Sequence, residues 1–165
     1  MATYKKENFK LILFILSTII LGTAFFIEYF LGYIPCNLCK IERIPYGLSM
    51  IILIANYNFR GNQIFYSILL ILIFSFSIII SIYHLGIEQG FIDESTVCVS
   101  ENLNILTKEE ILNSLNELRI SCKDVAFKIF GFSLTTYNMI ASILLLVLSI
   151  KIYLISNYIL FDLKK

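Results

Sequence analysis

Apolar residues run almost without interruption through three long stretches of the chain, at 11–30, 64–83 and 137–158. At a rise of about 1.5 Å per residue, a helix of this length matches the roughly 30 Å hydrocarbon core of a bilayer. A helix that crosses this core satisfies its own backbone hydrogen bonds, so each stretch is expected to be helical. The pattern therefore predicts three membrane-spanning helices.

A fourth apolar run, at 44–59, is shorter and carries Pro45 near its start. Proline is tolerated in the first turn of a helix, because the N–H that it lacks has no partner there. We therefore expect a fourth span, and an all-α membrane protein whose four transmembrane helices form one bundle. The chain, 1–165, is then a single integral membrane domain with two outer loops, at about 31–43 and 84–131.

The first stretch has one alternative, a cleaved secretory signal, because three lysines precede it. The apolar run is longer than that of a signal, and no small-x-small cleavage site follows it before Cys36. A spanning helix is the favoured interpretation.

Composition agrees with a membrane location, since 58% of the residues are hydrophobic and the mean hydropathy is +0.83. This apolar share exceeds that of ordinary soluble domains. The net charge is only +1, and the thirteen Lys and Arg residues are scattered rather than clustered. A nucleic-acid partner is therefore not expected.

Basic residues in short loops predict the orientation of the bundle, because they concentrate on the cytoplasmic side. Four spans put both termini on one side, and that side carries Lys5, Lys6, Lys10, Arg60, Lys164 and Lys165. The other side carries Lys40 and Arg43 in a short loop, and the longer segment 84–131 with four basic and eight acidic residues. The termini should be cytoplasmic, and both outer loops should face the periplasm or the outside of the cell.

All four cysteines fall in the two outer loops: Cys36 and Cys39 in the first, Cys98 and Cys122 in the second. Disulfides persist in an oxidising compartment, so two structural disulfides are one interpretation. A Cys-x-x-Cys disulfide, however, closes too small a loop to be a useful staple. The first pair is therefore expected to be reactive.

Arg43 follows Cys39 by four residues and should share a helix face with it if the second span begins near Cys39. The helix dipole and this cation would both lower the pKa of the Cys39 thiol and favour the attacking thiolate. Arg43 has two open roles, an interfacial anchor or a hydrogen-bond donor to a quinone carbonyl. Its proximity to Cys39 favours the second role.

The second loop is polar, and the capping-box pattern at 107–110 with apolar residues after it predicts a short amphipathic helix. Cys98 and Cys122 flank this helix. A disulfide between them would close a loop of about 25 residues, worth roughly 3 kcal/mol in the chain-entropy model. The wide spacing of this pair is unlike that of a zinc ribbon, so no metal site is expected.

Two further polar residues lie at the outer ends of apolar stretches. His84 ends the third stretch, where a hydrogen-bonded boundary residue is the more common role than a catalyst. Glu28 is an acid near the outer end of the first stretch and is a candidate partner for a basic group.

Three segments together resemble the DsbB family of disulfide-formation proteins, in order and spacing over nearly the whole chain. They are Pro35-Cys36-Asn37-Leu38-Cys39 with Glu42-Arg43, then Tyr83-His84-Leu85-Gly86-Ile87-Glu88, and Cys122-Lys123-Asp124 leading into Phe130-Gly131-Phe132-Ser133-Leu134. The resemblance implies an inner-membrane, four-helix thiol oxidoreductase that binds ubiquinone or menaquinone near the outer leaflet. The DsbA–DsbB–quinone route keeps the bacterial periplasm oxidising.

The resemblance also implies a role for each cysteine. Cys98 would form a mixed disulfide with a periplasmic DsbA-like thiol protein, and Cys122 would exchange with Cys36. Cys39 would face the quinone with Arg43 beside it, and His84 matches a family position near the quinone. Electrons would then leave through the quinone pool of the membrane.

Two alternatives remain at this stage. A vitamin-K-epoxide-reductase-like protein shares the chemistry, but its Cys-x-x-Cys pair lies by the last helix rather than before the second span. A non-enzymatic four-span assembly factor or transporter subunit would carry static, structural disulfides and would be indifferent to quinone.

Overall fold

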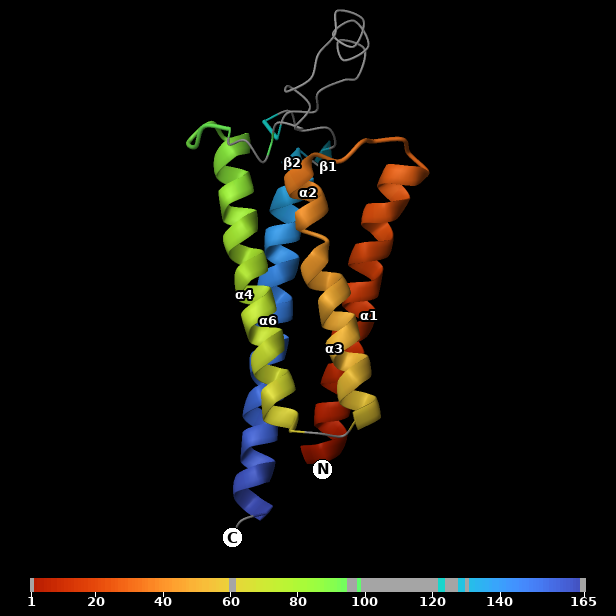
Figure 1. Cartoon of the computed structure of the whole chain (residues 1–165), viewed down its shortest axis with the longest axis vertical. Coiled ribbons are helices and arrows are strands. Elements are labelled where there is room, and N and C mark those ends of the chain that lie inside the picture. Colours follow the sequence, from red (N-terminus) through yellow and green to blue (C-terminus); the bar gives the residue numbers. More distant parts are fainter. Residues whose placement is uncertain are drawn as a thin grey trace, which may run out of the picture.

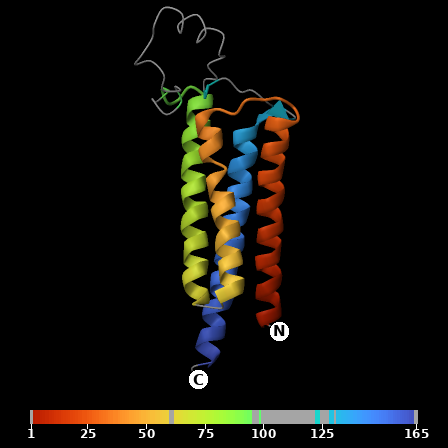
Figure 2. The same ribbon diagram turned by 45° about the vertical axis from the view of Figure 1, so that its right-hand side comes forward.

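The computed structural model describes residues 2–59, 62–94, 98, 122–123, 128–129 and 131–163. Four long helices lie side by side along the long axis of the molecule (Figures 1 and 2). They are α1 (Ala2–Tyr29), α3 (Ile44–Phe59), α4 (Gln63–Glu88) and α6 (Leu134–Leu163). A short helix, α2 (Asn37–Ile41), is stacked on the end of α3.

Three of these helices are long and apolar enough to cross a membrane: Lys6–Tyr29 in α1, Gln63–Glu88 in α4 and Leu134–Asp162 in α6. The three long apolar stretches of the sequence are therefore confirmed as helices of membrane length. The α4 and α6 helices extend beyond their apolar stretches at both ends, and α1 extends beyond its stretch at the N-terminal end. The α3 helix has the predicted bounds, 44–59, and packs between α1 and α4.

The first outer loop contains a helix that the sequence pattern did not predict. Cys39 lies in α2, which ends at Ile41, and α3 begins only at Ile44. Pro45 explains the break, because its missing N–H cannot donate to the carbonyl of Ile41 and its ring clashes with a continuous helix. The second span therefore does not begin near Cys39, which was the condition for Cys39 and Arg43 to share a helix face.

The α4 helix continues past His84 for one more turn and ends at Glu88. Gly90, with a φ of +76°, closes it in a Schellman motif: Phe91 N–H donates to the Gly86 carbonyl at 2.9 Å and Gly90 N–H to the Ile87 carbonyl at 3.0 Å. His84 was expected to end the span. It lies inside the helix instead, one turn before Glu88.

The core of the bundle combines apolar side chains with buried hydroxyl groups. The buried apolar cluster comprises Leu13, Tyr46, Leu53, Leu70, Phe74, Leu145 and Ile152. Hydroxyl groups link the helices across this core: Tyr46 Oη lies 3.0 Å from Ser142 Oγ, and Ser142 Oγ lies 2.9 Å from Ser77 Oγ. The Asn138 amide also donates to Ser81 Oγ at 2.8 Å. Such bonds satisfy polar groups that would otherwise be costly to bury.

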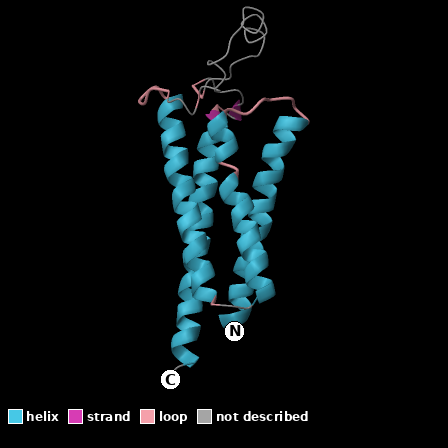
Figure 3. Cartoon of the chain, viewed as in Figure 1, coloured by secondary structure: helices cyan, strands magenta, loops and turns pink. Residues whose placement is uncertain are grey.

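The two ends of the bundle differ in content. Both termini lie at one end, where Lys10 Nζ donates to Asn56 and Gln63, each at 2.6 Å, and so joins α1, α3 and α4. The cysteine-bearing segments lie at the opposite end, with a small antiparallel hairpin of β1 (Lys128–Ile129) and β2 (Phe132–Ser133) (Figure 3). The amphipathic helix predicted from Thr107 lies outside the described residues.

Candidate thiol redox site

The first cysteine pair is built on the start of α2. Cys36 is the N-cap residue, and its Sγ accepts a hydrogen bond from the Cys39 backbone N–H at 3.1 Å. Both cysteines are free thiols; Cys36 is buried and Cys39 is partly buried. The side chain of an N-cap residue normally accepts such a bond, so the first thiol rather than the second occupies the positive end of the helix.

This geometry shifts the pKa values of the two thiols in opposite directions. Hydrogen bonds from Cys39, together with the ring of His84, lower the pKa of Cys36 to about 5 against the opposing effect of burial. The hydrogen bond to Cys36 raises the pKa of Cys39, and burial adds to this rise. The sequence had predicted that Cys39 would be the low-pKa thiol. In the reduced pair the thiolate is Cys36.

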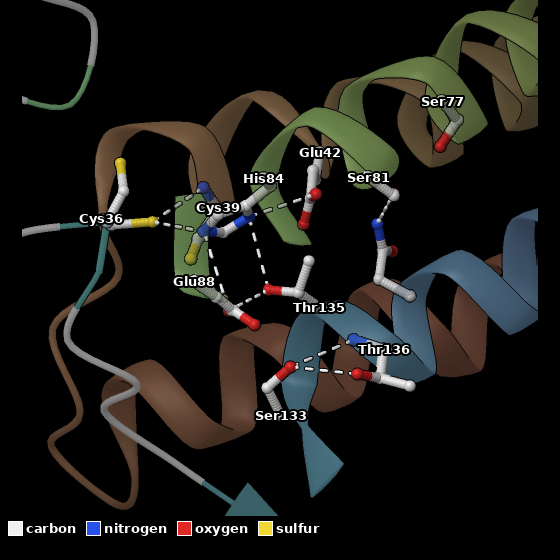
Figure 4. Close-up of polar contacts among 12 residues, drawn as sticks. Cys36, Cys39, Glu42, Ser77, Ser81, His84, Glu88, Ser133, Thr135 and Thr136 are labelled. Carbon is white, nitrogen blue, oxygen red and sulfur yellow. Dashed lines mark hydrogen bonds and ion pairs between the residues drawn. The ribbon is translucent and has the colours of Figure 1, made fainter. Parts of the chain in front are cut away.

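His84 is the centre of a buried polar network drawn from three helices (Figure 4). Its Nε2 lies 3.5 Å from Cys36 Sγ, and its Nδ1 lies 3.2 Å from the Glu42 carboxylate. Thr135 Oγ1, at the start of α6, lies 3.3 Å from the same Nδ1. Burial raises the pKa of Glu42, and the bond to His84 works against that rise. The imidazole thus connects a reactive thiol to a carboxylate.

Glu88 completes this network from one helical turn beyond His84. Its Oε1 accepts a hydrogen bond from Thr135 and lies 3.8 Å from His84 Nε2. Its side chain is only 6% exposed. The other oxygen, Oε2, is buried and has no hydrogen-bond partner within the described part of the chain. Such a group is costly to bury and needs an explanation.

The second cysteine pair forms a disulfide between Cys98 and Cys122, whose Cα atoms lie 5.5 Å apart. Both residues are buried, and they pack in one cluster with Cys36, Leu38 and Ile87. The two pairs are 59 positions apart in sequence at their nearest, between Cys39 and Cys98, and all four cysteines thus meet at one end of the bundle. The arrangement puts a disulfide beside a pair of thiols.

Arg43 lies in the break between α2 and α3 and turns toward α1. Its guanidinium pairs with the Glu28 carboxylate, lies 5.2 Å from the centroid of the Phe25 ring, and donates to the Ala24 carbonyl at 3.5 Å. Glu28 therefore has the basic partner that its position in the membrane called for. The expected face shared by Cys39 and Arg43 is not formed, because the break interrupts the helix between them.

A cavity of about 420 Å³ opens beside these groups, within the size range of ligand pockets. Its walls are apolar and come largely from α1 and α6, including Ile20, Ala24 and Ala141. Its lining also includes the polar residues Cys36, Cys39, Glu42, Arg43, His84, Glu88 and Thr135. A largely apolar chamber with a few polar groups in its wall suits a ring-shaped, largely apolar ligand.

The sequence located most of these residues but not their connections. Cys36, Cys39, Arg43 and His84 all line the cavity, and the Cys98–Cys122 disulfide packs behind Cys36. Glu42 and Glu88 were given no role. Glu88 could have been found from its spacing, since a residue four positions after His84 shares its face if the helix continues. Nothing in the sequence singles out Thr135.

Free thiols backed by an imidazole, beside a disulfide and within a bundle of membrane-length helices, define a membrane-embedded thiol redox protein. Residues 6–152 match the family described as disulfide bond formation protein DsbB, and the chain belongs to this family. It is thus a disulfide-forming membrane oxidoreductase by family, and the family suggests the inner membrane.

Two relatives match the chain over most of their length, and the second of them carries the name of this family. The uncharacterized protein RP370 of Rickettsia prowazekii (strain Madrid E) is 34% identical over 151 residues, which cover 87% of each chain. The disulfide bond formation protein B of Marinobacter nauticus is 25% identical over 150 residues, or 87% of this chain and 89% of its own. No solved structure matches the chain.

Proposed function

We propose that this protein oxidises a periplasmic DsbA-like thiol protein and passes the electrons through its two cysteine pairs to a membrane quinone. The observation that carries the proposal is the meeting of both pairs at one end of the bundle, with the Cys36–Cys39 pair lining the apolar cavity. The partner would meet the Cys98–Cys122 disulfide, and the quinone would meet the pair on the membrane side.

The proposed exchange balances as a series of thiol–disulfide reactions. A partner thiolate attacks Cys98 Sγ and releases Cys122, and the second partner thiol then displaces Cys98, so the partner leaves oxidised. Cys122 attacks Cys36 in an oxidised Cys36–Cys39 pair and releases Cys39. Cys98 then attacks Cys122, which releases Cys36 and restores the second disulfide.

The observed arrangement corresponds to the product of that series. Cys98 and Cys122 are joined, and Cys36 and Cys39 are free thiols that have received both electrons. Within the series, the disulfide between Cys36 and Cys122 also makes the Cys39 thiol easier to ionise. Cys36 is the main cause of the raised pKa of Cys39, and a Cys36 sulfur held in a disulfide no longer carries the charge that opposes Cys39 ionisation.

The residues around the cavity fit a quinone headgroup. Apolar walls from α1 and α6 suit the ring and its tail, while Arg43 and His84, which also line the cavity, would offer N–H donors to a carbonyl. When bound, a quinone supplies an acceptor for two electrons and two protons. His84 and Glu88 are placed to carry a proton between Cys36 and the cavity, because they lie within 4 Å of each other.

The topology of the proposal is four spans, with α3 as the second, in one integral membrane domain. The α3 helix is shorter than the others, but it lies parallel to them within the bundle (Figure 1). Lys5, Lys6 and Lys10 precede the first apolar stretch and favour cytoplasmic termini. The cysteines would then face the periplasm.

Two experiments test the proposal. A membrane-impermeant thiol reagent should label the reduced cysteines in intact spheroplasts, and labelling only after lysis would contradict the orientation. In isolated membranes, thiol trapping should find the Cys36–Cys39 pair oxidised when the quinone pool is oxidised and reduced when it is reduced. A thiol state that ignores the pool would favour the static, non-enzymatic alternative.

The exchange step has its own test, in variants that keep only two cysteines. With Cys39→Ser and Cys98→Ser, a mild oxidant should join Cys36 to Cys122, as mapped by mass spectrometry. The matched variant with Cys36→Ser and Cys98→Ser keeps Cys39 and Cys122, which should join more slowly. Faster joining in the matched variant would assign the exchange to Cys39.

A further inference from the structure

The reduced thiol pair shares its chamber with two other groups that can bind a metal ion. The Sγ atoms of Cys36 and Cys39 and a ring nitrogen of His84 all lie within 4.8 Å of one another. Tetrahedral zinc with sulfur and nitrogen ligands, at bond lengths of about 2.0 to 2.3 Å, requires ligand atoms roughly 3.5 to 3.8 Å apart. The separation of 3.5 Å between Cys36 Sγ and His84 Nε2 already meets this requirement.

Glu88 supplies the independent observation that points to a ligand. Its carboxylate lies 3.8 Å from His84 Nε2, its side chain is 6% exposed, and its buried Oε2 lacks a hydrogen-bond partner among the described residues. The opposite nitrogen of the ring, Nδ1, lies against the Glu42 carboxylate at 3.2 Å. Metal-binding histidines commonly hold a carboxylate on the nitrogen that does not bind the metal. His84 therefore presents Nε2 toward the thiols in a fixed orientation.

We propose that the reduced form of this protein binds one Zn²⁺ ion through Cys36, Cys39 and His84, whose ligand atoms already lie together, and through Glu88, whose carboxylate rotates toward the two Sγ atoms to become the fourth ligand. Binding releases the protons of the two thiols and forms two sulfur–zinc bonds, one nitrogen–zinc bond and one oxygen–zinc bond, with no change in oxidation state. The spacing of the four cysteines had argued against a zinc ribbon. This site uses only one cysteine pair, and a disulfide between Cys36 and Cys39 removes it.

The consequence of this site rests on the proposed function, whereas the binding itself does not. Thiolates held by zinc do not donate electrons to an acceptor in the cavity. Zn²⁺ should therefore arrest the protein in its reduced state until a chelator removes the ion.

The test uses the full-length chain in detergent with Cys98→Ala and Cys122→Ala, so that only the first pair can be reduced. The reduced, metal-free protein is titrated with Zn²⁺ against a chromophoric chelator, and Co²⁺ replaces Zn²⁺ to report tetrahedral thiolate ligands by its visible spectrum. We expect one ion per reduced chain, no binding by the oxidised chain, and no competition from Mg²⁺.

Carboxylate variants separate the four-ligand site from binding by two thiols alone. Glu88→Gln and Glu42→Gln should each weaken Zn²⁺ binding by about 10- to 100-fold. Asp93→Asn, an exposed acid just beyond α4, is the matched control and should bind normally. Unchanged circular dichroism and thermal unfolding would establish that the variants fold. Equal affinity in Glu88→Gln, His84→Gln and the parent would overturn the proposal, as would binding to the oxidised pair.

An activity measurement keeps the two proposals apart. Zn²⁺ should slow quinone reduction by the wild-type protein, and a chelator should restore it. Stoichiometric zinc binding by a protein that reduces no quinone even without zinc would leave the metal site standing and overturn the proposed function. Quinone reduction without any zinc binding would do the reverse.

Discussion

The two cysteine pairs of this protein share one cluster but are built in opposite ways. Cys36 and Cys39 are three positions apart at the start of a short helix, among an imidazole and two carboxylates. Cys98 and Cys122 are 24 positions apart in sequence and are joined to each other. The first pair closes almost no loop and takes its chemistry from its neighbours, whereas the second closes a long loop that its disulfide constrains. The first pair is reactive because of the side chains around it, and the second pair constrains the chain because its cysteines are far apart in sequence.

The largest expected effect comes from removing one cysteine of each pair and comparing a protein thiol donor with a small dithiol. Cys39→Ser should abolish quinone reduction by every thiol donor, because the acceptor side of the path is lost. Cys98→Ala should abolish oxidation of a DsbA-like protein but retain slow oxidation of a small dithiol that can reach Cys36 and Cys39 directly. Quinone absorbance and the thiol state of the donor measure both reactions. Normal turnover of the protein donor by Cys98→Ala would mean that the entry cysteine is wrongly assigned.

Arg43→Lys tests whether the first pair depends on a fixed guanidinium. An ammonium keeps the charge but loses the planar arrangement of donors, and one charge-assisted hydrogen bond is worth about 1.5 to 3 kcal/mol, or roughly ten- to over a hundredfold in affinity. The apparent KM for quinone should rise by that factor, while the disulfides still form under a strong chemical oxidant. Glu28→Gln, which leaves the guanidinium in place, is the companion variant and should have a smaller effect. Wild-type kinetics in Arg43→Lys would reduce Arg43 to an interfacial anchor.

The ionisation of Cys36 gives a prediction in pH. Its pKa is lowered to about 5, so the thiolate is held at neutral pH and is lost as the pH falls through about 5. Ultraviolet absorbance of the thiolate, measured with a chelator present in the reduced Cys98→Ala and Cys122→Ala variant, should follow this transition. His84→Ala removes one of the causes and should move the midpoint upward. A midpoint that does not change in His84→Ala would remove the imidazole from the electrostatics of the thiol.

The smallest effect concerns the helix end that holds His84 and Glu88 in place. Gly90 has a φ of +76°, and a residue with a side chain costs about 1 to 2 kcal/mol in the left-handed region. Gly90→Ala should lower the unfolding free energy in mixed detergent by that amount. Gly22→Ala, where a new Cβ meets no atom within 4 Å and the backbone is helical, is the matched control and should be neutral or slightly stabilising. Equal effects of the two variants would exclude a role for the Schellman motif.

Hydropathy was sufficient to predict the long helices, because a bilayer demands continuous apolar runs of fixed length. It failed where polar residues face the interior of the bundle. The run in α4 stops at Tyr83, yet the helix continues to Glu88 because the residues of that last turn pack inward. Gly90 was the stop signal in the sequence, since glycine after a helix is the more direct mark of its end.

Most residues of the site were predicted from the sequence, but the contacts between them were not. Four-residue spacing joins Cys39 to Arg43 only on a continuous helix, and the break that Pro45 causes ends the first helix at Ile41, before Arg43. The pairing of Arg43 with Glu28, and of His84 with Glu42, depends on how α1, α3 and α4 pack. Such contacts between distant segments have no periodic signal in a single sequence.

His84 is the sole histidine of the chain, and its two ring nitrogens face chemically different neighbours, a thiol and a carboxylate. Its imidazole would therefore give one unoverlapped pair of nitrogen resonances in a magnetic resonance spectrum of histidine-labelled protein. The resonance of Nε2 should respond to the oxidation of Cys36, and that of Nδ1 to Glu42. The chain thus carries its own reporter of electron flow, readable in a native lipid membrane without any added probe.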